Sequence, residues 1–160
     1  MARHPGRQPH AKQSLRVWLR MLGATTVIEK RIRAYLKSEF GSTLPRFDVL
    51  AALDRETRPI TMSQLTDHLL VSNANLTGLV NRLVEDGLVT RQSDPDDRRA
   101  QRVVLTDAGR SAFRTMAARH EALVDSFFQA LSDDEMESLL GLTAKLNAAL
   151  HAEAKNKEKP

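Results

Sequence analysis

Apolar residues recur every three or four positions over residues 15–40, the spacing that places them on one face of an α-helix. Gly41 follows this stretch, and glycine readily adopts the left-handed conformation that ends a helix. The pattern therefore predicts a long amphipathic helix near the start of the chain. Its apolar stripe consists of Trp18, Met21, Leu22, Thr25, Ile28, Ile32, Tyr35 and Leu36.

Two short helices are predicted next from the residues at their ends. Pro45, which is tolerated in a first helical turn, opens one helix, and Pro59 lies beyond its end. Thr61 and Gln64 have the spacing of a capping box, in which each side chain satisfies a backbone N–H of the first turn. The second of these helices is therefore expected to run from Thr61 to about Leu70.

A fourth helix is predicted between Ser72, which can cap it, and Gly87, which can supply a left-handed stop. The apolar face of this helix has the i, i+3, i+4, i+7 spacing and consists of Leu76, Leu79, Val80 and Leu83. Two short helices separated by a few residues form a candidate helix-turn-helix.

The pattern then changes to short β-prone runs at residues 88–92 and 102–105, around the charged, turn-rich loop SDPDDRRAQ. These runs predict a hairpin with a charged tip. Thr106 can cap a long helix after it, and Ser132 and Glu135 form a second capping box that opens a last helix.

The first helix and the last two carry more apolar surface than the small central domain can cover. A second copy of the chain is the expected cover, which makes these helices a dimer interface. The predicted fold class is mainly α with a small β-hairpin wing: a winged helix-turn-helix flanked by N- and C-terminal dimerisation helices.

Composition narrows the class of protein. The 160 residues include no cysteine, which excludes a disulfide framework and a thiol-based switch. No stretch approaches the roughly 20 apolar residues of a membrane span, and the basic N-terminus lacks the apolar core of a secretory signal. We therefore expect a soluble, cytoplasmic protein with no membrane partner.

The net charge of +4 is unevenly distributed. Residues 1–45 hold nine Lys and Arg against two Asp and Glu, whereas residues 46–105 hold eight against nine. DNA binding must therefore be argued from individual side chains.

The fourth predicted helix has the two faces that a helix in the DNA major groove needs, one apolar and one polar. Asn can pair with adenine edges or phosphates, Thr can place its methyl on thymine, and Gly78 allows close approach. Ser72 and the amides at the helix start suit a phosphate. The alternative is a polar face that only contacts solvent. Against this alternative, Asn is a poor helix former, so three Asn in one short helix call for a functional reason. The polar residues are Asn73, Asn75, Thr77, Asn81 and Arg82.

The hairpin tip is the second candidate DNA-binding element. Arg99, on a thin ribbon, could enter the minor groove, where negative potential is concentrated. Asp97 could orient the guanidinium of Arg99, and Arg98 could contact a phosphate. Such a loop taken alone is more often a solvated turn, but here it follows a helix-turn-helix.

At this point the sequence resembles the MarR family of regulators. The resemblance rests on L-T-G-L-V-N-R-L-V-E-D-G-L-V at 76–89 and on R-x-x-D-P-D-D-R-R-A-x-x-V-x-L-T-x-x-G from Arg91 to Gly109. Membership implies a homodimer, a palindromic DNA operator and usually repression that a small ligand releases. Carried over by position, Asn73, Asn75, Thr77 and Asn81 fall on the reading helix, and Asp97 and Arg99 fall on the wing.

The resemblance also implies a ligand crevice between the dimer helices and the reading lobe. Ordinary core packing competes with this role for Trp18 and Met21, and a surface salt bridge competes with it for Arg46. The candidate lining residues are Trp18, Arg20, Met21, Tyr35, Arg46 and His68.

Residues 44–54 and the basic first helix look similar to a subgroup that responds to aromatic-acid thioesters such as hydroxycinnamoyl-CoA. The surplus of Lys and Arg in this helix would suit nucleotide phosphates, a DNA backbone or solvation alike. We expect an aromatic acid or its thioester as effector, and no cofactor. The scattered His68, His120 and His151 do not predict a metal site.

No nucleophile elbow or phosphate-binding loop supports an enzyme. The remaining rival is a winged helix that binds protein or RNA, because a fold alone does not fix its use. The predicted organisation is a flexible basic N-terminus at 1–13, a dimerisation helix at 14–43, a DNA-binding lobe at 44–105, dimerisation helices at 106–152 and a flexible tail at 153–160.

Overall fold

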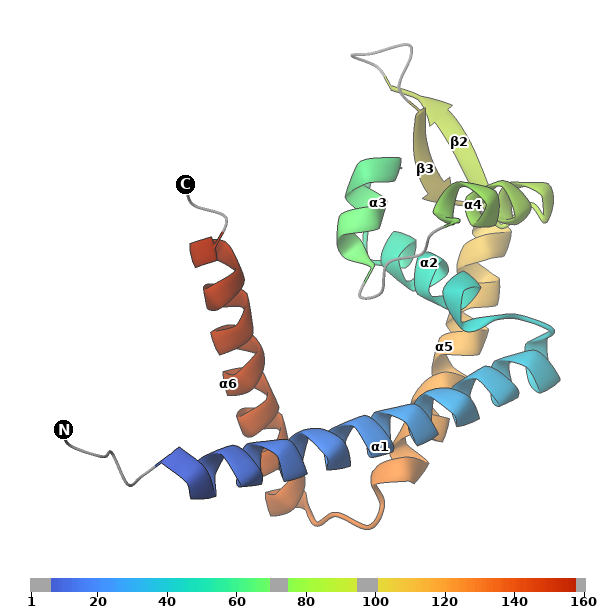
Figure 1. Ribbon diagram of the computed structural model, residues 1–160. Helices are drawn as coiled ribbons and strands as arrows, with labels where there is room; N and C mark the ends of the chain where they lie inside the picture. Colours follow the sequence, from blue (N-terminus) through green and yellow to red (C-terminus); the bar gives the residue numbers. More distant parts are fainter. Residues whose placement is uncertain (1–6, 70–74, 95–100, 158–160) are drawn as a thin grey trace. The chain divides into compact units, whose positions relative to one another are not determined.

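The computed structural model describes residues 7–69, 75–94 and 101–157 (Figure 1). The chain forms two compact units, Met1–Ala122 and Leu123–Pro160, which are described separately below. The division falls inside a helix, whereas the sequence pattern predicts a boundary at residue 105. Within the described residues, no helix is long and apolar enough to cross a membrane.

The described residues form helices and strands in the order expected of a winged helix-turn-helix, so the predicted fold class is confirmed. The elements are α1 (Arg7–Phe40), α2 (Leu44–Asp54), β1 (Ile60–Thr61), α3 (Met62–His68), α4 (Leu76–Glu85), β2 (Val89–Ser93), β3 (Gln101–Leu105), α5 (Asp107–Phe128) and α6 (Asp133–Lys157).

Most of the predicted helix ends are confirmed. Gly41 and Gly87 have φ angles of 58° and 72°, in the left-handed region. The capping box of Thr61 and Gln64 is present at the start of α3. That of Ser132 and Glu135, in the second unit, is present at the start of α6.

Two helices extend further than the sequence predicts, and one short strand was not predicted. Helix α1 begins at Arg7, although residues 7–13 were expected to be flexible, because Pro9 falls in the first turn, where proline is tolerated. Helix α6 continues to Lys157, into the expected tail, because that segment contains good helix formers although it has no apolar face. The two-residue strand β1 was missed because it is too short for alternation to be visible.

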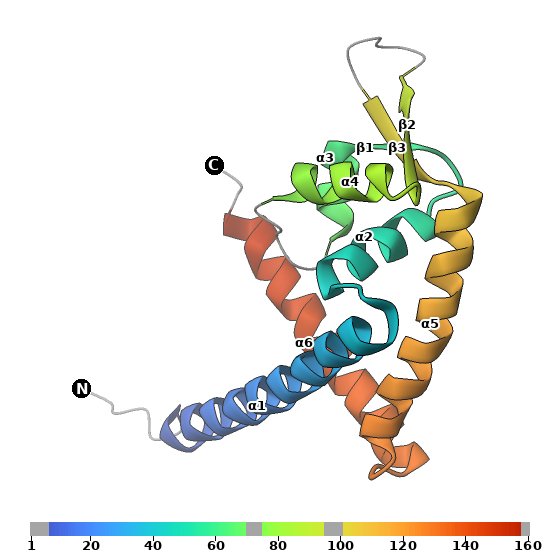
Figure 2. The same ribbon diagram turned by 90° about the vertical axis from the view of Figure 1, so that its right-hand side faces the viewer.

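The three strands form an antiparallel sheet in the order β1-β3-β2. The predicted hairpin is confirmed: β2 pairs with β3 from Val89↔Leu105 to Ser93↔Gln101. Ile60 of β1 lies opposite Val103, so the buried side chains Ile60, Val89, Val103 and Leu105 share one face of the sheet. Helices α2, α3 and α4 contact the sheet (Figure 2).

The hydrophobic core lies in the first unit and draws on every element from α1 to α5. Helix α2 contributes the most to it, with five buried residues. The buried apolar residues are Ile32, Leu36, Phe47, Val49, Leu50, Ala52, Leu53, Ile60, Leu65, Leu76, Val80, Leu83, Val89, Val103, Leu105 and Met116.

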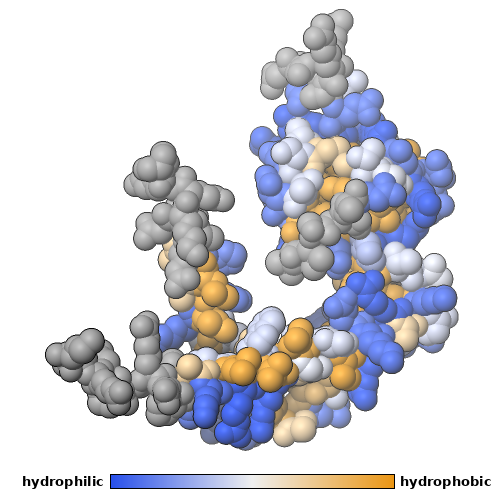
Figure 3. Space-filling view, viewed as in Figure 1, coloured by the Kyte–Doolittle hydropathy of each residue, from blue (hydrophilic) through white to orange (hydrophobic). Residues whose placement is uncertain are grey.

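Much of the predicted apolar stripe of α1 is not covered by the rest of the first unit. Ile32 and Leu36 are buried, whereas Trp18 and Leu22 are 56% and 44% exposed. Figure 3 shows apolar surface along this helix. In the second unit, α6 likewise exposes Leu139, Leu140, Leu142, Leu146 and Leu150.

The start of α5 is joined tightly to the turn that follows α4. The Thr106 hydroxyl donates to the Gly87 carbonyl at 2.6 Å and accepts from the Gly109 N–H at 2.9 Å. A Cβ atom added to Gly109 would lie 1.9 Å from the backbone oxygen of Leu88. Only glycine therefore fits where α5 crosses this turn.

We expect Gly109→Ala to lower the free energy of unfolding by about 1–3 kcal/mol, because the added methyl group forces the backbone of the turn to move. Ser111→Ala is the matched control, because Ser111 is exposed in the next turn of α5, and it should change stability by less than about 0.5 kcal/mol. Urea unfolding at one protein concentration measures both. Equal stability of the two variants would contradict the close approach.

His120 of α5 packs against the ring of Phe47, with ring centroids 4.7 Å apart. Burial lowers the pKa of His120 below its ordinary value of 6.5, because it disfavours the charged imidazolium. Above that ordinary value the histidine is neutral in both the folded and the unfolded chain, and it does not make stability depend on pH. Below it, the unfolded chain takes up the proton more readily, so stability falls.

We therefore expect His120→Gln to lose less stability than the parent chain when the pH is lowered from about 7 to about 5. Urea unfolding at the two pH values measures the difference. An identical loss in both proteins would show that His120 is as easily protonated in the folded state as in the unfolded one.

Candidate nucleic-acid interface

Helix α4 has one face in the core and one face exposed, as the sequence predicts. Leu76, Val80 and Leu83 are buried. Thr77 and Asn81 are one turn apart on the exposed face. Figures 1 and 2 show this helix against the base of the β2–β3 hairpin, and α4 contacts β2. The exposed face of α4 and the hairpin therefore lie next to each other.

The predicted start of α4 was wrong. The N-cap is Asn75 rather than Ser72, and the Asn75 side-chain oxygen Oδ1 accepts from the Gly78 N–H at 3.2 Å. Asn75 therefore caps the start of the helix instead of belonging to its polar face. Ser72 and Asn73, two of the predicted contact residues, lie outside the described residues.

Gly78 also has a role in the cap, beside the close approach to DNA that the sequence predicts. A Cβ atom added there would lie 2.5 Å from the Asn75 side-chain oxygen. The glycine is thus required by the cap itself, whatever its part in approach to DNA.

Of the predicted reading residues, Thr77, Asn81 and Arg82 are exposed on α4. The Asn81 side-chain oxygen accepts a hydrogen bond from the guanidinium of Arg91 in β2. Sequence reasoning missed Arg91. The alternation of the strand could have found it, because Arg91 is two residues after the buried Val89 and so shares the face of the sheet that α4 contacts.

The loop end of the β2–β3 hairpin is fixed by a partly buried ion pair that was also missed. Arg102 Nε lies 2.6 Å from an oxygen of Asp94, whose side chain is 7% exposed. Arg102 Nη1 also donates to the Pro59 carbonyl at 3.3 Å, which ties the hairpin to the segment before β1. The predicted tip residues Asp97, Arg98 and Arg99 lie outside the described residues.

A cavity of about 300 Å³ lies within the first unit beneath the turn after α1. Arg46 is in its wall, and its Nη2 lies 2.6 Å from an oxygen of Asp86, the C-cap of α4. The cavity thus shares an arginine with the end of the candidate reading helix. The lining consists of Phe40, Gly41, Ser42, Arg46, Leu50, Leu88, Ala112, Thr115 and Met116.

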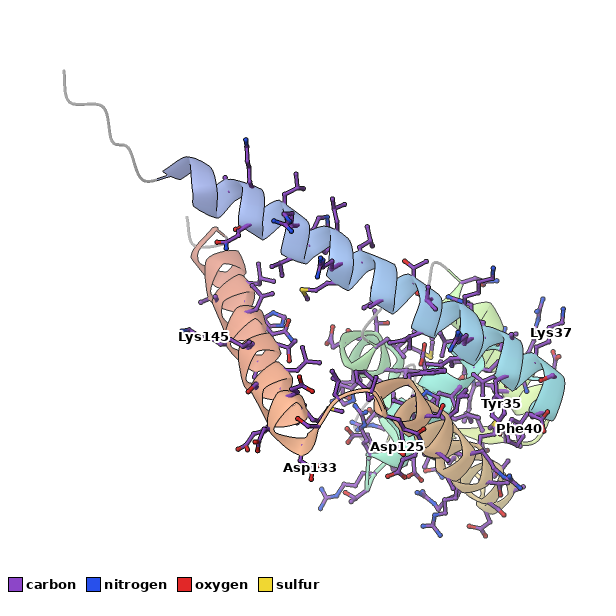
Figure 4. All side chains as sticks on the ribbon, turned by 90° about the horizontal axis from the view of Figure 1, so that it is seen from below. Tyr35, Lys37, Phe40, Asp125, Asp133 and Lys145 are labelled. Carbon is purple, nitrogen blue, oxygen red and sulfur yellow. The ribbon has the colours of Figure 1, made fainter. Side chains whose placement is uncertain are left out.

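The other five predicted ligand residues do not line this cavity. Trp18 and Arg20 are exposed on α1, and Met21 is half-buried. Tyr35 packs edge-on against Phe40, with centroids 6.2 Å apart, as Figure 4 shows near the end of α1.

His68 lies with its Nδ1 3.2 Å from a carboxylate oxygen of Glu56. No group of three or more His, Asp or Glu that could hold a metal occurs in the part of the chain that the structure describes.

Comparison with known proteins places this arrangement among transcriptional regulators. A model of the MarR family matches residues 40–100. The HTH-type transcriptional regulator YkoM of Bacillus subtilis is 31% identical over 129 residues, which cover 80% of each chain. The transcriptional activatory protein BadR of Rhodopseudomonas palustris is 33% identical over 104 residues, 64% of this chain and 59% of that protein.

Solved structures agree with the sequence matches. The MarR family regulator Sco3205 of Streptomyces coelicolor, crystallised in complex with DNA, superposes with a TM-score of 0.76 at 26% identity, over 86% of this chain and 91% of that one. A MarR family regulator of Silicibacter pomeroyi superposes with a TM-score of 0.74 at 29% identity, over 91% and 99%.

We expect Asp94→Ala to loosen the β2–β3 hairpin, because it leaves the Arg102 guanidinium without its buried partner. Backbone amides of β2 and β3 should exchange hydrogen for deuterium about tenfold faster or more, since the loss of such a partner costs more than about 1.4 kcal/mol. Gln92→Ala, at an exposed position of the same hairpin, is the control and should leave exchange unchanged. Unaltered exchange in Asp94→Ala would mean that the pair does not hold the hairpin.

Proposed function

Because the chain belongs to the MarR family of DNA-binding transcriptional regulators, and is not an enzyme, we propose that it acts as a homodimer which binds a palindromic operator and leaves it when a small molecule binds. The observation that supports DNA binding most is the exposed polar face of α4 beside the β2–β3 hairpin. A helix and an adjoining ribbon are the two elements with which winged helices enter neighbouring grooves.

In this proposal α4 lies in the major groove. Thr77, Asn81 and Arg82 face base edges and phosphates, and the segment before the helix, with Ser72, Asn73 and Asn75, approaches the backbone. The hairpin tip carries Arg98 and Arg99, with Asp97 beside them, toward phosphate and the minor groove.

The dimer is proposed to form through the long helices. Leu15, Trp18 and Leu22 of α1 are exposed in the first unit, and Leu140 and Leu142 of α6 are exposed in the second. Apolar surface of this extent is normally covered in solution, and a second copy of the chain brings two reading helices to two half-sites of one palindrome.

The cavity beside Arg46 is the proposed effector site, and its mixed lining suits a small aromatic acid or the acyl part of its CoA thioester. A carboxylate there would compete with Asp86 for the Arg46 guanidinium. Because Asp86 is the C-cap of α4, this competition would act directly on the reading helix.

We further propose repression of genes for aromatic-compound catabolism or efflux as the outcome. The name of BadR, an activatory protein, makes activation the alternative. Residues 46–105 hold nearly equal numbers of basic and acidic side chains. This balance favours a second candidate function, a module that binds protein or RNA, because a lobe with almost no net charge attracts DNA only weakly.

Fluorescence anisotropy with duplexes from beside its own gene tests DNA binding. We expect affinity to fall steeply between about 50 and 200 mM salt, since phosphate contacts release counterions. Addition of hydroxycinnamic acid or hydroxycinnamoyl-CoA should release the DNA. No binding by a folded protein would favour the interaction module, and DNA binding that neither compound alters would contradict an aromatic effector.

Two variants test the effector site, because each breaks the pair between Arg46 and Asp86 but only one removes the arginine. We expect Asp86→Asn to bind hydroxycinnamic acid more tightly than the parent, since Arg46 is freed, and Arg46→Gln to bind it more weakly. The change should be modest, about three- to tenfold, because Asp86 is half exposed. Isothermal titration measures both affinities, and equal changes in the two variants would place the effector elsewhere.

A further inference from the structure

A side-chain hydrogen bond joins the exposed face of α4 to the hairpin strand β2. Arg91 Nη2 donates to the side-chain oxygen of Asn81. A guanidinium has only donors, so the atom of the Asn81 amide that faces it must be the oxygen. The amide nitrogen, with its two N–H groups, is therefore turned away from Arg91.

Asn81 and Arg91 are both exposed, so burial does not fix the position of either polar group. Arg91 lies opposite Val103 in the sheet, on the face that carries the buried Val89. Strand β2 contacts α4, and Arg91 reaches the helix from this face. Thr77 is one helical turn from Asn81, so the pair belongs to the exposed face that is proposed to read DNA.

The pairing changes what Asn81 can recognise. Free asparagine reads adenine with two bonds, because its oxygen accepts from N6 and its nitrogen donates to N7. In this protein the oxygen is engaged by Arg91. The Asn81 oxygen has two lone pairs, of which Arg91 occupies one, so the donors of the pair (the Asn81 amide N–H groups and the remaining guanidinium N–H groups) outnumber its one remaining acceptor site.

We propose that Asn81 and Arg91 form one donor-rich reading unit that selects guanine over adenine at its position in the operator. Guanine presents two neighbouring acceptors, O6 and N7, in the major groove, whereas adenine presents one acceptor and one donor. The inference rests on the proposed DNA-binding role of α4 and adds a specificity to it. Arg91 is a positioning residue in this unit, because it fixes the orientation of the Asn81 amide.

Phosphate oxygens are also acceptors, so the same donor pair could bind the DNA backbone. A backbone contact lowers affinity for every sequence alike when it is removed, whereas a base contact alters the preferred base at one position. One experiment can therefore distinguish a contact with a phosphate from a contact with a base.

The experiment is selection of bound duplexes from a randomised DNA library by the full-length protein and four variants. Asn81→Ala identifies the position at which Asn81 acts, as the one whose base preference is lost. At that position we expect the parent to enrich guanine over adenine by about tenfold or more. Arg91→Ala frees the Asn81 oxygen, so the preference should shift toward adenine, and Arg91→Lys should retain guanine because lysine is also only a donor.

Arg82→Ala is the matched control, since it removes one exposed cation from α4 next to Asn81. It should weaken binding without changing the base at the Asn81 position. Urea unfolding of each variant shows whether it is folded, and Arg91→Lys provides the comparison if Arg91→Ala is not.

Three results would overturn the inference. The parent could prefer adenine at the Asn81 position, the guanine preference could persist in Arg91→Ala, or both Asn81→Ala and Arg91→Ala could weaken all sequences equally, as a phosphate contact would. Enrichment of no motif by the folded parent would instead contradict the proposed operator binding, and the reading unit with it.

Discussion

The burial of one face of α4 is the constraint on which the rest of the arrangement depends. Leu76, Val80 and Leu83 fix this face in the core, so the opposite side of the helix must face outward. Polar contacts then hold the helix along its length. Asn75 caps its start, Arg91 joins its middle to the hairpin, and Asp86 joins its end to Arg46 of α2. The hydrophobic effect supplies the position, and these hydrogen bonds supply the orientation of individual side chains.

The same helix links the proposed DNA surface to the proposed effector cavity. The turn after α4 packs so closely on the start of α5 that Gly109 has no room for a side chain, and both Leu88 of that turn and Met116 of α5 line the cavity. A ligand that disturbs Arg46 therefore acts within a short chain of direct contacts. Such contacts give a physical route for coupling between the effector cavity and the reading helix.

Sequence reasoning succeeded where the local pattern determines the structure. The stripe of α4, the left-handed glycines 41 and 87, and the capping box at Thr61 each follow from a few neighbouring residues. It failed where the deciding partner is distant or where two candidates compete. Ser72 and Asn75 can both cap a helix, and only the three-dimensional fit of Gly78 under the Asn75 side chain decides between them. The pairing of Arg46 with Asp86 depends on the packing of α2 against the end of α4, so no spacing in the chain reveals it. Strand alternation places Arg91 on the face toward α4, but the bond to Asn81 depends on how the helix packs on that face.

The central claim is that α4 and the β2–β3 hairpin together form the DNA-binding surface. Hydrogen–deuterium exchange of the full-length protein, with and without a duplex that it has selected, tests this most directly. The account predicts that exchange slows in α4 and in β2 and β3 when DNA is bound, with smaller changes in α6. Tight DNA binding that leaves exchange in α4 and the hairpin unchanged would contradict it.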